Sequence, residues 1–386
     1  MNRHFLRDIA DIQTGPFGSQ LHKEDYVDIG TPIVTVEHLG NRVFTEQNLP
    51  KVSDEDKARL SKYVLKEGDI VFSRVGSVDR CSYVDAAHDG WMFSGRCLRV
   101  RPNTEVDPLY LYYFFCLEDT KQFVRNIAVG ATMPSINTKL LGEVEVAYPS
   151  QTEQQKIVAL LSALDDKIEI NQKINDNLQQ QAAALFANFY DQAETEVGFT
   201  EMIQILGGGT PKTGESSYWN GDIPFFTPKD VGFPYTLTTE KTITEEGLAH
   251  CNSRLYPINT VFVTARGTVG KVGLPGVPMA MNQSCYALVG KDTHQLLVYF
   301  YTLKAVDRLK HKASGAVFDA ITTRDFEAEN IMKLSDDDTK AFLDVAEPIY
   351  QAVLNNSIEN LRLSELRDSL LPKLMNGEID VTDTRL

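Results

Sequence analysis

The stretch 152–190 has the pattern of one long amphipathic helix, and it constrains the fold more than any other part of the chain. Apolar residues at Ile157, Leu164 and Leu178 follow the spacing of a helical stripe that has to pack against another element. In a heptad frame that starts at Ile157, the polar Asn171 falls on the same seam, where an Asn typically sets register and pairing. From periodicity alone, an ordinary core helix is an equally good interpretation.

A second copy of this stretch favours a pair of helices. Shifting the sequence by 185 residues aligns 128–161 with 313–346, and apolar positions recur in register along the helix that follows. The seam of the second copy is predicted to contain Phe342, Ile349, Asn356 and Leu363. Asn171 and Asn356 are therefore expected to meet near the middle of the pair.

The repeat predicts the order domain, helix, domain, helix. The predicted spans are a first globular domain at 1–150, a first long helix at 151–190, a second globular domain at 191–335, and a second long helix with a C-terminal tail at 336–386. The first helix is about 55 Å long, whereas the linker 191–199 reaches only about 30 Å. The helices are therefore expected to run antiparallel, with the two domains at opposite ends and related by a pseudo-two-fold axis, as in readers of two DNA half-sites.

Each globular part mixes strand-like and helical runs, which predicts an α/β or α+β class. The strand-like runs are 33–36, 69–73, 97–100, 261–264 and 284–289, and the helical runs are 107–126 and 294–312. In the second long helix, Pro348 is expected to kink or restart the helix. Pro372 is expected to close it before the turn at Asn376 and Gly377.

Composition narrows the class of protein. With 42% hydrophobic and 24% charged residues, the 386-residue chain is typical of a soluble globular protein. No stretch resembles a signal peptide or a membrane span, so a cytoplasmic location is expected. The five cysteines form no CxxC pair, which favours reduced thiols over a zinc or disulfide framework. The net charge of −15 argues against a nucleic-acid partner, but the acidic excess is concentrated in the helical stretches, which leaves room for local basic surfaces.

Motifs for catalysis are missing from the sequence. Gly270-Lys271 lacks the upstream glycine of a phosphate-binding loop, and the GGGTP run at 207–211 is better interpreted as a plain loop. The seven histidines have no metal-ligand spacing, and there is no GxSxG elbow or base-amination motif. We therefore expect no catalytic residue, metal or cofactor in this chain.

Candidate DNA contacts are scattered polar and basic residues near turns. In the first part they are Thr14, Lys23, Ser73, Arg74, Ser77, Arg80, Arg96 and Lys139. In the second part they are Thr210, Lys212, Lys229, Arg266, Thr268, Lys271, Asn282, Gln283, Ser284 and Arg324. Arg can recognise guanine and Asn or Gln can recognise adenine, while Ser, Thr and Lys suit phosphates. For each residue, an ordinary solvated side chain is an equally good interpretation. The basic helical face of Lys304, Arg308, Lys310, His311 and Lys312 is more typical of a solvated surface than of a DNA-backbone contact.

Three blocks, 149–176, 207–231 and 366–381, together resemble the specificity subunit of a type I restriction-modification system. The resemblance covers essentially the whole chain. It implies two target recognition domains, each reading one part of a split, asymmetric DNA sequence, and an antiparallel coiled coil that fixes the gap. It also implies two modification subunits that carry S-adenosylmethionine and the catalysis, and restriction subunits that use ATP and Mg where they are present. The first domain opens with TGPFGSQL, whereas the second has the GGTPxT form, which indicates that the two half-sites differ.

Two other classes of protein compete with this interpretation. One is an enzyme in which recognition and methyltransferase activity are fused, and the missing motifs count against it. The other is a two-domain scaffold with no DNA role, which only the acidic charge favours.

Overall fold

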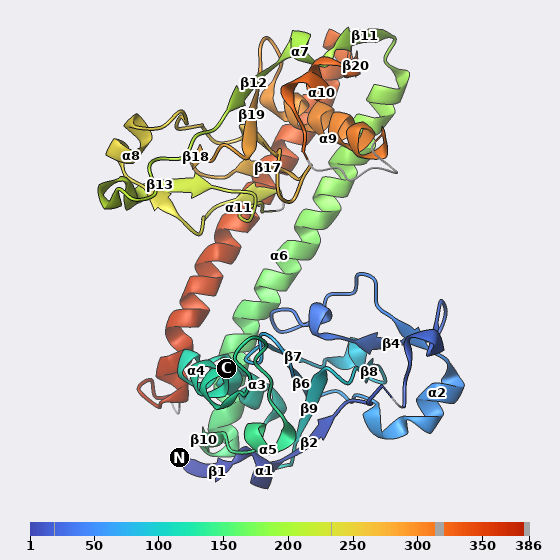
Figure 1. The fold of residues 1–386 in the computed structure, drawn as a ribbon, viewed down its shortest axis with the longest axis vertical. Coiled ribbons are helices and arrows are strands. Elements are labelled where there is room, and N and C mark those ends of the chain that lie inside the picture. The colour runs from blue at the N-terminus through green and yellow to red at the C-terminus, as the bar shows by residue number, and fades with distance from the viewer. Residues whose placement is uncertain (19, 233, 313–319, 382–386) are drawn as a thin grey trace. The chain divides into compact units, whose positions relative to one another are not determined.

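The computed structural model describes residues 1–18, 20–232, 234–312 and 320–381, with the Lys23 side chain outside the described part (Figure 1). The chain divides into two compact units. The first unit is Met1–Asp165 together with Glu365–Leu386, and the second is Asp166–Ser364. Because both cuts fall inside the long helices, each long helix contributes residues to both units.

The first unit is built around an antiparallel sheet in the order β2-β9-β6-β7. These strands are β2 (Ala10–Thr14), β9 (Cys97–Pro102), β6 (Ile70–Ser73) and β7 (Cys81–Tyr83). A second sheet in the order β3-β5-β4-β8 consists of Tyr26–Val27, Lys51–Val52, Thr31–Val34 and Met92–Phe93. A separate antiparallel pair joins β1 (Asn2–Phe5) to β10 (Glu145–Tyr148). Each of the two sheets has its own apolar core cluster.

The first unit also contains helices, most of which contact the larger sheet or a neighbouring helix. They are α1 (Leu6–Ile9), α2 (Asp54–Arg59), α3 (Pro108–Cys116), α4 (Glu118–Ile127) and α5 (Thr138–Leu141). The predicted helical run over 107–126 is confirmed, but it is divided into α3 and α4, because the backbone leaves the helical conformation at Leu117 (φ −59°, ψ 134°). The Leu117 side chain packs against the apolar core there, and this tertiary contact outweighs the local helical pattern.

The second unit repeats this element order. Its main sheet has the order β12-β19-β16-β17-β14 and consists of Ile203–Gly207, Cys285–Gly290, Val261–Thr264, Val272–Pro275 and Tyr235–Thr236. The smaller sheet, β15-β13-β18, consists of Thr242–Ile243, Trp219–Phe226 and Ala280–Met281, and β11 (Thr195–Gly198) pairs with β20 (Asn330–Lys333). Its helices are α7 (Phe199–Met202), α8 (Glu245–Ala249), α9 (Gln295–Lys312) and α10 (Thr323–Glu327). The internal repeat and the mixed helix-and-sheet class are therefore confirmed.

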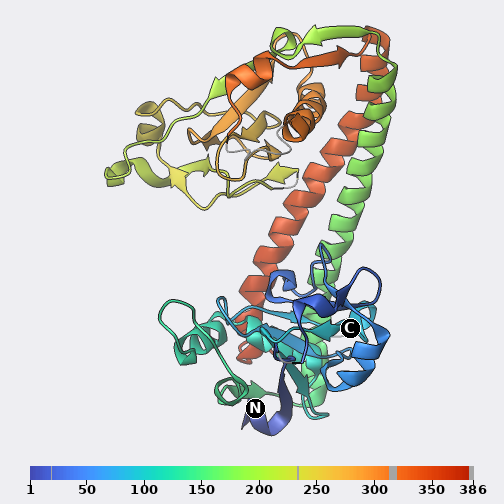
Figure 2. The same cartoon turned by 45° about the vertical axis from the view of Figure 1, so that its right-hand side comes forward.

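The two long helices are α6 (Gln151–Gln192) and α11 (Asp336–Met375), which lie side by side in both views of the ribbon (Figures 1 and 2). In the second unit, the Asn175 side-chain amide donates to the Val353 carbonyl at 3.3 Å. In the first unit, Arg367 Nη1 donates to Asp165 Oδ1 at 2.6 Å. Since the partner number falls as the α6 number rises, the helices are antiparallel, as predicted.

The predicted pairing of Asn171 with Asn356 was wrong by about one helical turn. Asn356 Nδ2 donates to Asn175 Oδ1 at 2.8 Å, and Asn171 Nδ2 donates to Asn360 Oδ1 at 2.8 Å and to Glu359 Oε2 at 2.7 Å. Hydrogen bonds to Asn171 and Lys167 hold the pKa of the Glu359 carboxyl below its usual value.

The heptad frame fails because the buried stripe has a longer period. Along this half of α6 the buried residues are Asn171, Asn175, Gln179, Ala182, Phe186 and Tyr190. Their spacing repeats every 11 residues, as in nearly straight helices, so a seven-residue frame drifts off the stripe. Of the predicted seam residues, Ile157, Asn171 and Phe342 are buried, whereas Leu164, Leu178, Ile349, Asn356 and Leu363 are half-buried at its sides.

Helix α11 continues through both of its prolines, so the predicted restart at Pro348 does not occur. Pro348 is exposed, and the residues anchored in the core on either side of it, Ala346 and Tyr350, hold the helix together across the lost backbone hydrogen bond. The predicted turn at Asn376 and Gly377 is confirmed, since α11 ends at Met375 and Gly377 has φ +74°. No helix in the described part of the chain is long and apolar enough to cross a membrane.

Candidate nucleic-acid interface

Four loop segments of the first unit are joined by backbone hydrogen bonds, and we call them the first loop cluster. They are residues 15–17 after β2, 74–80 between β6 and β7, 94–96 before β9, and 129–136 before α5. Arg74 N donates to Arg96 O at 2.8 Å, and Ile136 N donates to Arg74 O at 2.9 Å. Gly76 N donates to Pro134 O at 2.8 Å. Residues far apart in the sequence therefore form one surface.

Glycine is required where two of these segments touch. A Cβ added at Gly15 would lie 2.1 Å from Ser94 O, and one added at Gly95 would lie 2.3 Å from Pro16 O. Because real Cβ atoms do not approach this closely, any side chain at either position would push the segments apart. Gly76 has φ +76°, which glycine adopts without strain.

The surface of the first loop cluster combines cations with apolar side chains. The Arg74 guanidinium donates to Gly95 O at 2.8 Å and lies 5.8 Å from the centre of the Phe17 ring. The candidates Ser77, Arg80 and Arg96 are exposed. Three apolar side chains are exposed as well, namely Phe17 (56%), Val129 (55%) and Met133 (66%).

The other candidates of the first unit have different positions. Ser73 is buried and its hydroxyl donates to Val75 O at 2.7 Å, so this side chain closes the turn between β6 and β7. Thr14 is half-buried at the end of β2. Lys139 is exposed on α5, whose neighbours are α1 and β2. Lys23 begins a short 3-10 helix, and its side chain lies outside the described part.

The second unit has a second loop cluster with the same backbone hydrogen bonds. Its described segments are 208–211, 265–271 and 282–284. Ala265 N donates to Ser284 O at 2.8 Å, as Arg74 does to Arg96. Ile321 N donates to Ala265 O at 3.0 Å, which confirms the predicted match of Ile136 with Ile321.

The GGGTP run forms the predicted loop after β12. A Cβ added at Gly208 would lie 2.1 Å from Asn282 O, just as one at Gly15 would lie against Ser94 O. This match makes Thr210 the counterpart of Phe17, since each lies two residues after the equivalent glycine. The Thr210 hydroxyl donates to the Gln283 side-chain oxygen.

Five of the predicted residues line one open cavity of about 450 Å³ in the second loop cluster. They are Lys229, Arg266, Thr268, Asn282 and Ser284. The Lys229 ammonium lies 3.9 Å from the Glu240 carboxylate, and both are exposed. Guanidinium, amide and hydroxyl groups therefore point into a single space, the mixture that can recognise base edges.

The remaining candidates of the second unit are exposed but do not line this cavity. Lys212 is exposed on the loop after β12, and its carbonyl accepts a hydrogen bond from Trp219 Nε1 at 3.2 Å. Lys271 is exposed and is the counterpart of Arg80, because Thr264 N donates to Lys271 O at 2.9 Å as Ser73 N does to Arg80 O. Arg324 is exposed on α10, which packs against α7.

The basic face of α9 has a structural role that the sequence did not reveal. Arg308 Nε lies 3.1 Å from the carboxylate of the buried Glu329, and Lys312 pairs with the same group. Arg308 also donates to the Tyr190 hydroxyl at 3.0 Å, and Lys304 lies over the Tyr190 ring. The interpretation as a simple solvated surface was therefore wrong for Arg308 and Lys312, which neutralise a buried carboxylate.

Buried thiols lie at equivalent places beside the two loop clusters. Cys97 begins β9, directly after the 94–96 segment. Cys285 begins β19, directly after the 282–284 segment. Burial raises the pKa of each thiol to about 12. Both groups are therefore protonated at neutral pH and unsuited to nucleophilic chemistry.

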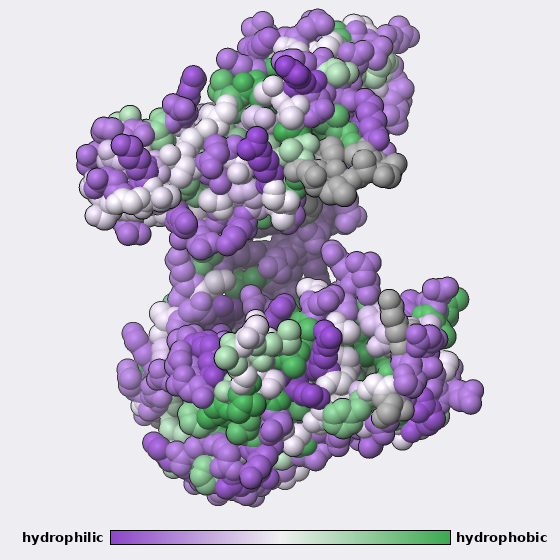
Figure 3. All heavy atoms as spheres, viewed as in Figure 1, coloured by the Kyte–Doolittle hydropathy of each residue, from purple (hydrophilic) through white to green (hydrophobic). Residues whose placement is uncertain are grey.

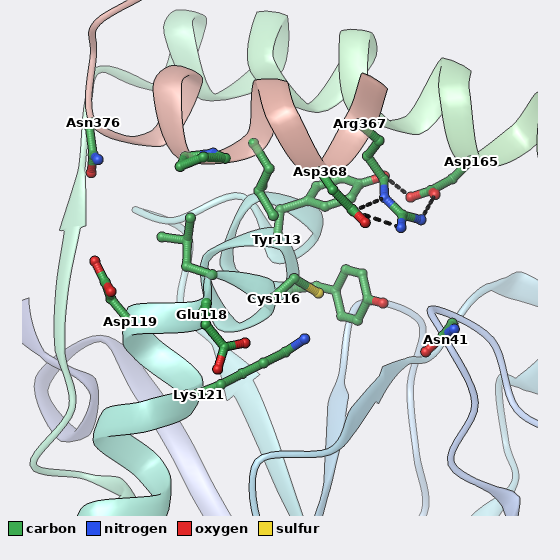
Figure 4. Close-up of a pocket in the computed structure, with 14 residues that line it drawn as sticks. Asn41, Tyr113, Cys116, Glu118, Asp119, Lys121, Asp165, Arg367, Asp368 and Asn376 are labelled. Atoms are coloured by element: carbon green, nitrogen blue, oxygen red, sulfur yellow. Dashed lines mark hydrogen bonds and ion pairs between the residues drawn. The ribbon is translucent and has the colours of Figure 1, made fainter. Parts of the chain in front are cut away.

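A cavity of about 520 Å³ in the first unit lies between α3, α4 and the last turns of α11 (Figure 4). In it, the Tyr113 hydroxyl donates to Asp165 Oδ2 at 2.6 Å, and Arg367 bridges Asp165 and Asp368. Four of the charged side chains that line it are acidic and two are basic, which does not suit a phosphate. No local sequence pattern indicates this cavity, because Asp165 and Arg367 are 202 residues apart.

A repeated domain with arginine, amide and hydroxyl groups gathered on matching loops defines a class of protein, the two-domain nucleic-acid reader. The family model described as "Type I restriction modification DNA specificity domain" matches residues 2–180 and 195–333. The chain belongs to this family.

Relatives and a solved structure agree with this assignment. The HindI type I specificity subunit of Haemophilus influenzae is 25% identical over 84% of this chain and 89% of its own length. The MjaIX specificity subunit of Methanocaldococcus jannaschii is 23% identical over 98% of this chain and 93% of its own length. The crystal structure of a type I restriction-modification S subunit from M. genitalium has the same fold, with a TM-score of 0.57, 16% identity and coverage of 97% and 95%. This chain is a non-catalytic DNA specificity subunit, and the fused enzyme and the scaffold without a DNA role are not favoured.

Proposed function

We propose that the chain reads a split, asymmetric DNA sequence, with the first loop cluster on one half-site and the second loop cluster on the other. The observation that carries this proposal is that the two clusters share a backbone frame and differ in their exposed side chains. Phe17 corresponds to Thr210, and Arg96 corresponds to Ser284. Different side chains on one frame select different bases, so the two half-sites differ in sequence.

We further propose that two modification subunits dock on this chain and supply the methyl transfer with S-adenosylmethionine. Where restriction subunits join the complex, they would supply ATP- and Mg-dependent chemistry. A docking surface is available on the outer side of α6, where Ile170 and Ile174 are 53% and 44% exposed beside a shallow depression of about 300 Å³. Two neighbouring aliphatic side chains, one turn apart and exposed, suit an apolar partner surface.

Mapping methylated positions in host DNA, with the gene intact and with it deleted, tests the target. The expected result is a split motif with two unlike halves that is methylated only when the gene is intact. Restoring the gene should restore methylation at the same positions. No gene-dependent motif, or a motif without a gap, would contradict the proposal.

The length of the helical pair is proposed to set the gap between the half-sites. Inserting 11 residues in each of α6 and α11 keeps the phase of the buried stripe and adds three turns, about 16 Å. The expected gap is longer by about five base pairs, with both half-sites unchanged. The same insertion after the exposed Gly214 is the control and should leave the gap as it was. An unchanged gap in the lengthened protein would refute this role of the helices.

A further inference from the structure

We propose that the first loop cluster reads its half-site partly through the methyl group of a thymine, which contacts the Phe17 ring. This inference rests on the proposed function, because it takes the first loop cluster as the reader of one half-site. It identifies the chemical group of the base that is recognised, which neither membership of the family nor the internal repeat specifies. Phe17 is then a specificity-determining residue.

Comparing equivalent positions of the two loop clusters shows which exposed side chains differ between them. In the second cluster the position of Phe17 is occupied by Thr210, whose hydroxyl is bonded to Gln283. Gly95, beneath Phe17, corresponds to Gln283, since Ser94 and Asn282 occupy the same turn. An amide and a hydroxyl in one cluster are thus replaced by an aromatic ring in the other.

The exposed apolar side chains of the first cluster have no covering element among the described residues. Phe17, Val129 and Met133 are all more than half exposed, although Phe17 precedes Val129 by 112 residues in the sequence. On the face of the molecule drawn in Figure 3, hydrophilic residues predominate. Three exposed apolar side chains on one set of joined loops therefore indicate a contact surface.

Base-edge chemistry identifies what such a surface can recognise. In the major groove of DNA the thymine methyl is the apolar group, and apolar side chains are its natural partners. Arg80 and Arg96 are exposed in the same cluster and suit the flanking phosphates. This combination of cations and apolar groups favours DNA over an apolar protein partner.

Arg74 acts as a positioning residue for the ring. Its guanidinium is held by the bond to Gly95 O and lies 5.8 Å from the centre of the Phe17 ring, within the range of a cation–π contact. The half-buried Arg74 thus supports a ring that is itself exposed. A fixed ring can discriminate the presence of a single methyl group better than a freely rotating one.

The test uses the complex of this chain with its modification subunits and duplexes that carry the mapped target. Each thymine of the first half-site is replaced in turn by deoxyuridine, which removes only the methyl group. For the unaltered protein, one replacement is expected to weaken binding about tenfold. For Phe17→Ala, the thymine and deoxyuridine duplexes are expected to bind equally.

Two controls isolate the effect of the ring. Deoxyuridine in the second half-site should affect Phe17→Ala and the unaltered protein equally. Ile29→Ala removes an apolar side chain of the same unit that is 90% exposed, and it should keep the full thymine preference. Arg74→Ala should reduce the preference for thymine in the first half-site while leaving binding of the second half-site unchanged.

Several results would overturn the inference while the proposed function stands. They are a first half-site without an A·T pair, binding that no deoxyuridine changes, and a thymine preference that survives in Phe17→Ala. Loss of subunit assembly in Phe17→Ala, without any methyl effect, would instead assign the ring to a protein contact and also overturn it. The absence of any split motif would be a failure of the proposed function itself.

Discussion

The first and second loop clusters have the same backbone frame but present different exposed side chains beside their cations. Ser73 and Thr264 both use their hydroxyls inside the turn, and Gly15 and Gly208 both lie against a carbonyl of the neighbouring turn. The first cluster presents an aromatic ring, whereas the second presents a cavity lined by Arg266 and polar groups. The buried backbone frame is therefore separate from the exposed residues that are proposed to select a sequence.

This separation has an energetic reason. Exchanging exposed side chains usually changes stability by less than about 0.5 kcal/mol, whereas overpacking a buried contact costs about 1–3 kcal/mol. Exposed residues can therefore change, and with them the DNA sequence that a domain recognises, while the buried backbone frame still folds. Substitutions in the backbone frame, at the exposed residues and outside the clusters test this separation.

The largest effect is expected from filling the frame glycines. In Gly15→Ala and Gly208→Ala the new Cβ would meet a carbonyl oxygen at 2.1 Å, so the segments must move apart. Overpacking of about 1–3 kcal/mol predicts a loss of target methylation of about 10- to 100-fold. Gly18→Ala and Gly214→Ala are matched controls, because no atom of the described residues lies within 4 Å of the added Cβ. Equal effects at frame and control positions would show that no shared frame exists.

Arg266→Ala tests whether the second cluster reads a base. Loss of a guanidinium that recognises guanine costs about 1–3 kcal/mol of discrimination at one base pair. We expect the methylated motif to become degenerate at one position of the second half-site while the first half-site stays unchanged. Lys229→Ala is the comparison, since loss of a phosphate contact weakens binding of all sequences and lowers the salt dependence. Degeneracy in the first half-site would assign the clusters the other way round.

An exchange of surface residues tests the separation directly. Phe17→Thr combined with Arg96→Ser gives the first cluster two side chains of the second. Because both residues are exposed, the unfolding free energy should change by less than about 1 kcal/mol, measured by denaturant titration. The methylated motif should change in the first half-site alone. A large loss of stability would mean that frame and reader are not separable.

The smallest effect is expected outside the clusters. Lys139→Ala and Arg324→Ala each remove an exposed cation from α5 or α10. Binding of the target should weaken by no more than a few-fold, with both half-sites unchanged and a slightly smaller salt dependence. Salt titrations of the complex would measure this. A change of motif in either variant would extend the reading surface beyond the loop clusters.

Much of the fold could be predicted because its signals are local or repeated. The span of α6, the strand at Val261–Thr264 and the helix ending at Lys312 follow from short-range patterns. The candidate site was predicted in part: five residues of the second unit line one cavity, while Ser73 proved to be buried within a turn. Exposure depends on what packs above a residue, and local sequence carries little of that information.

The sequence alone determined that this chain is two copies of one domain with two long helices, because repetition and apolar periodicity are written along the chain. Only the tertiary structure decided which residues meet. It paired Asn175 with Asn356, and it placed Phe17 where the other copy has Thr210. Such pairings depend on small rotations of the helices and on close backbone contacts between distant segments. If one helix or strand shifts by one residue against its neighbour, the residue pairs change while the apolar pattern of the sequence stays the same.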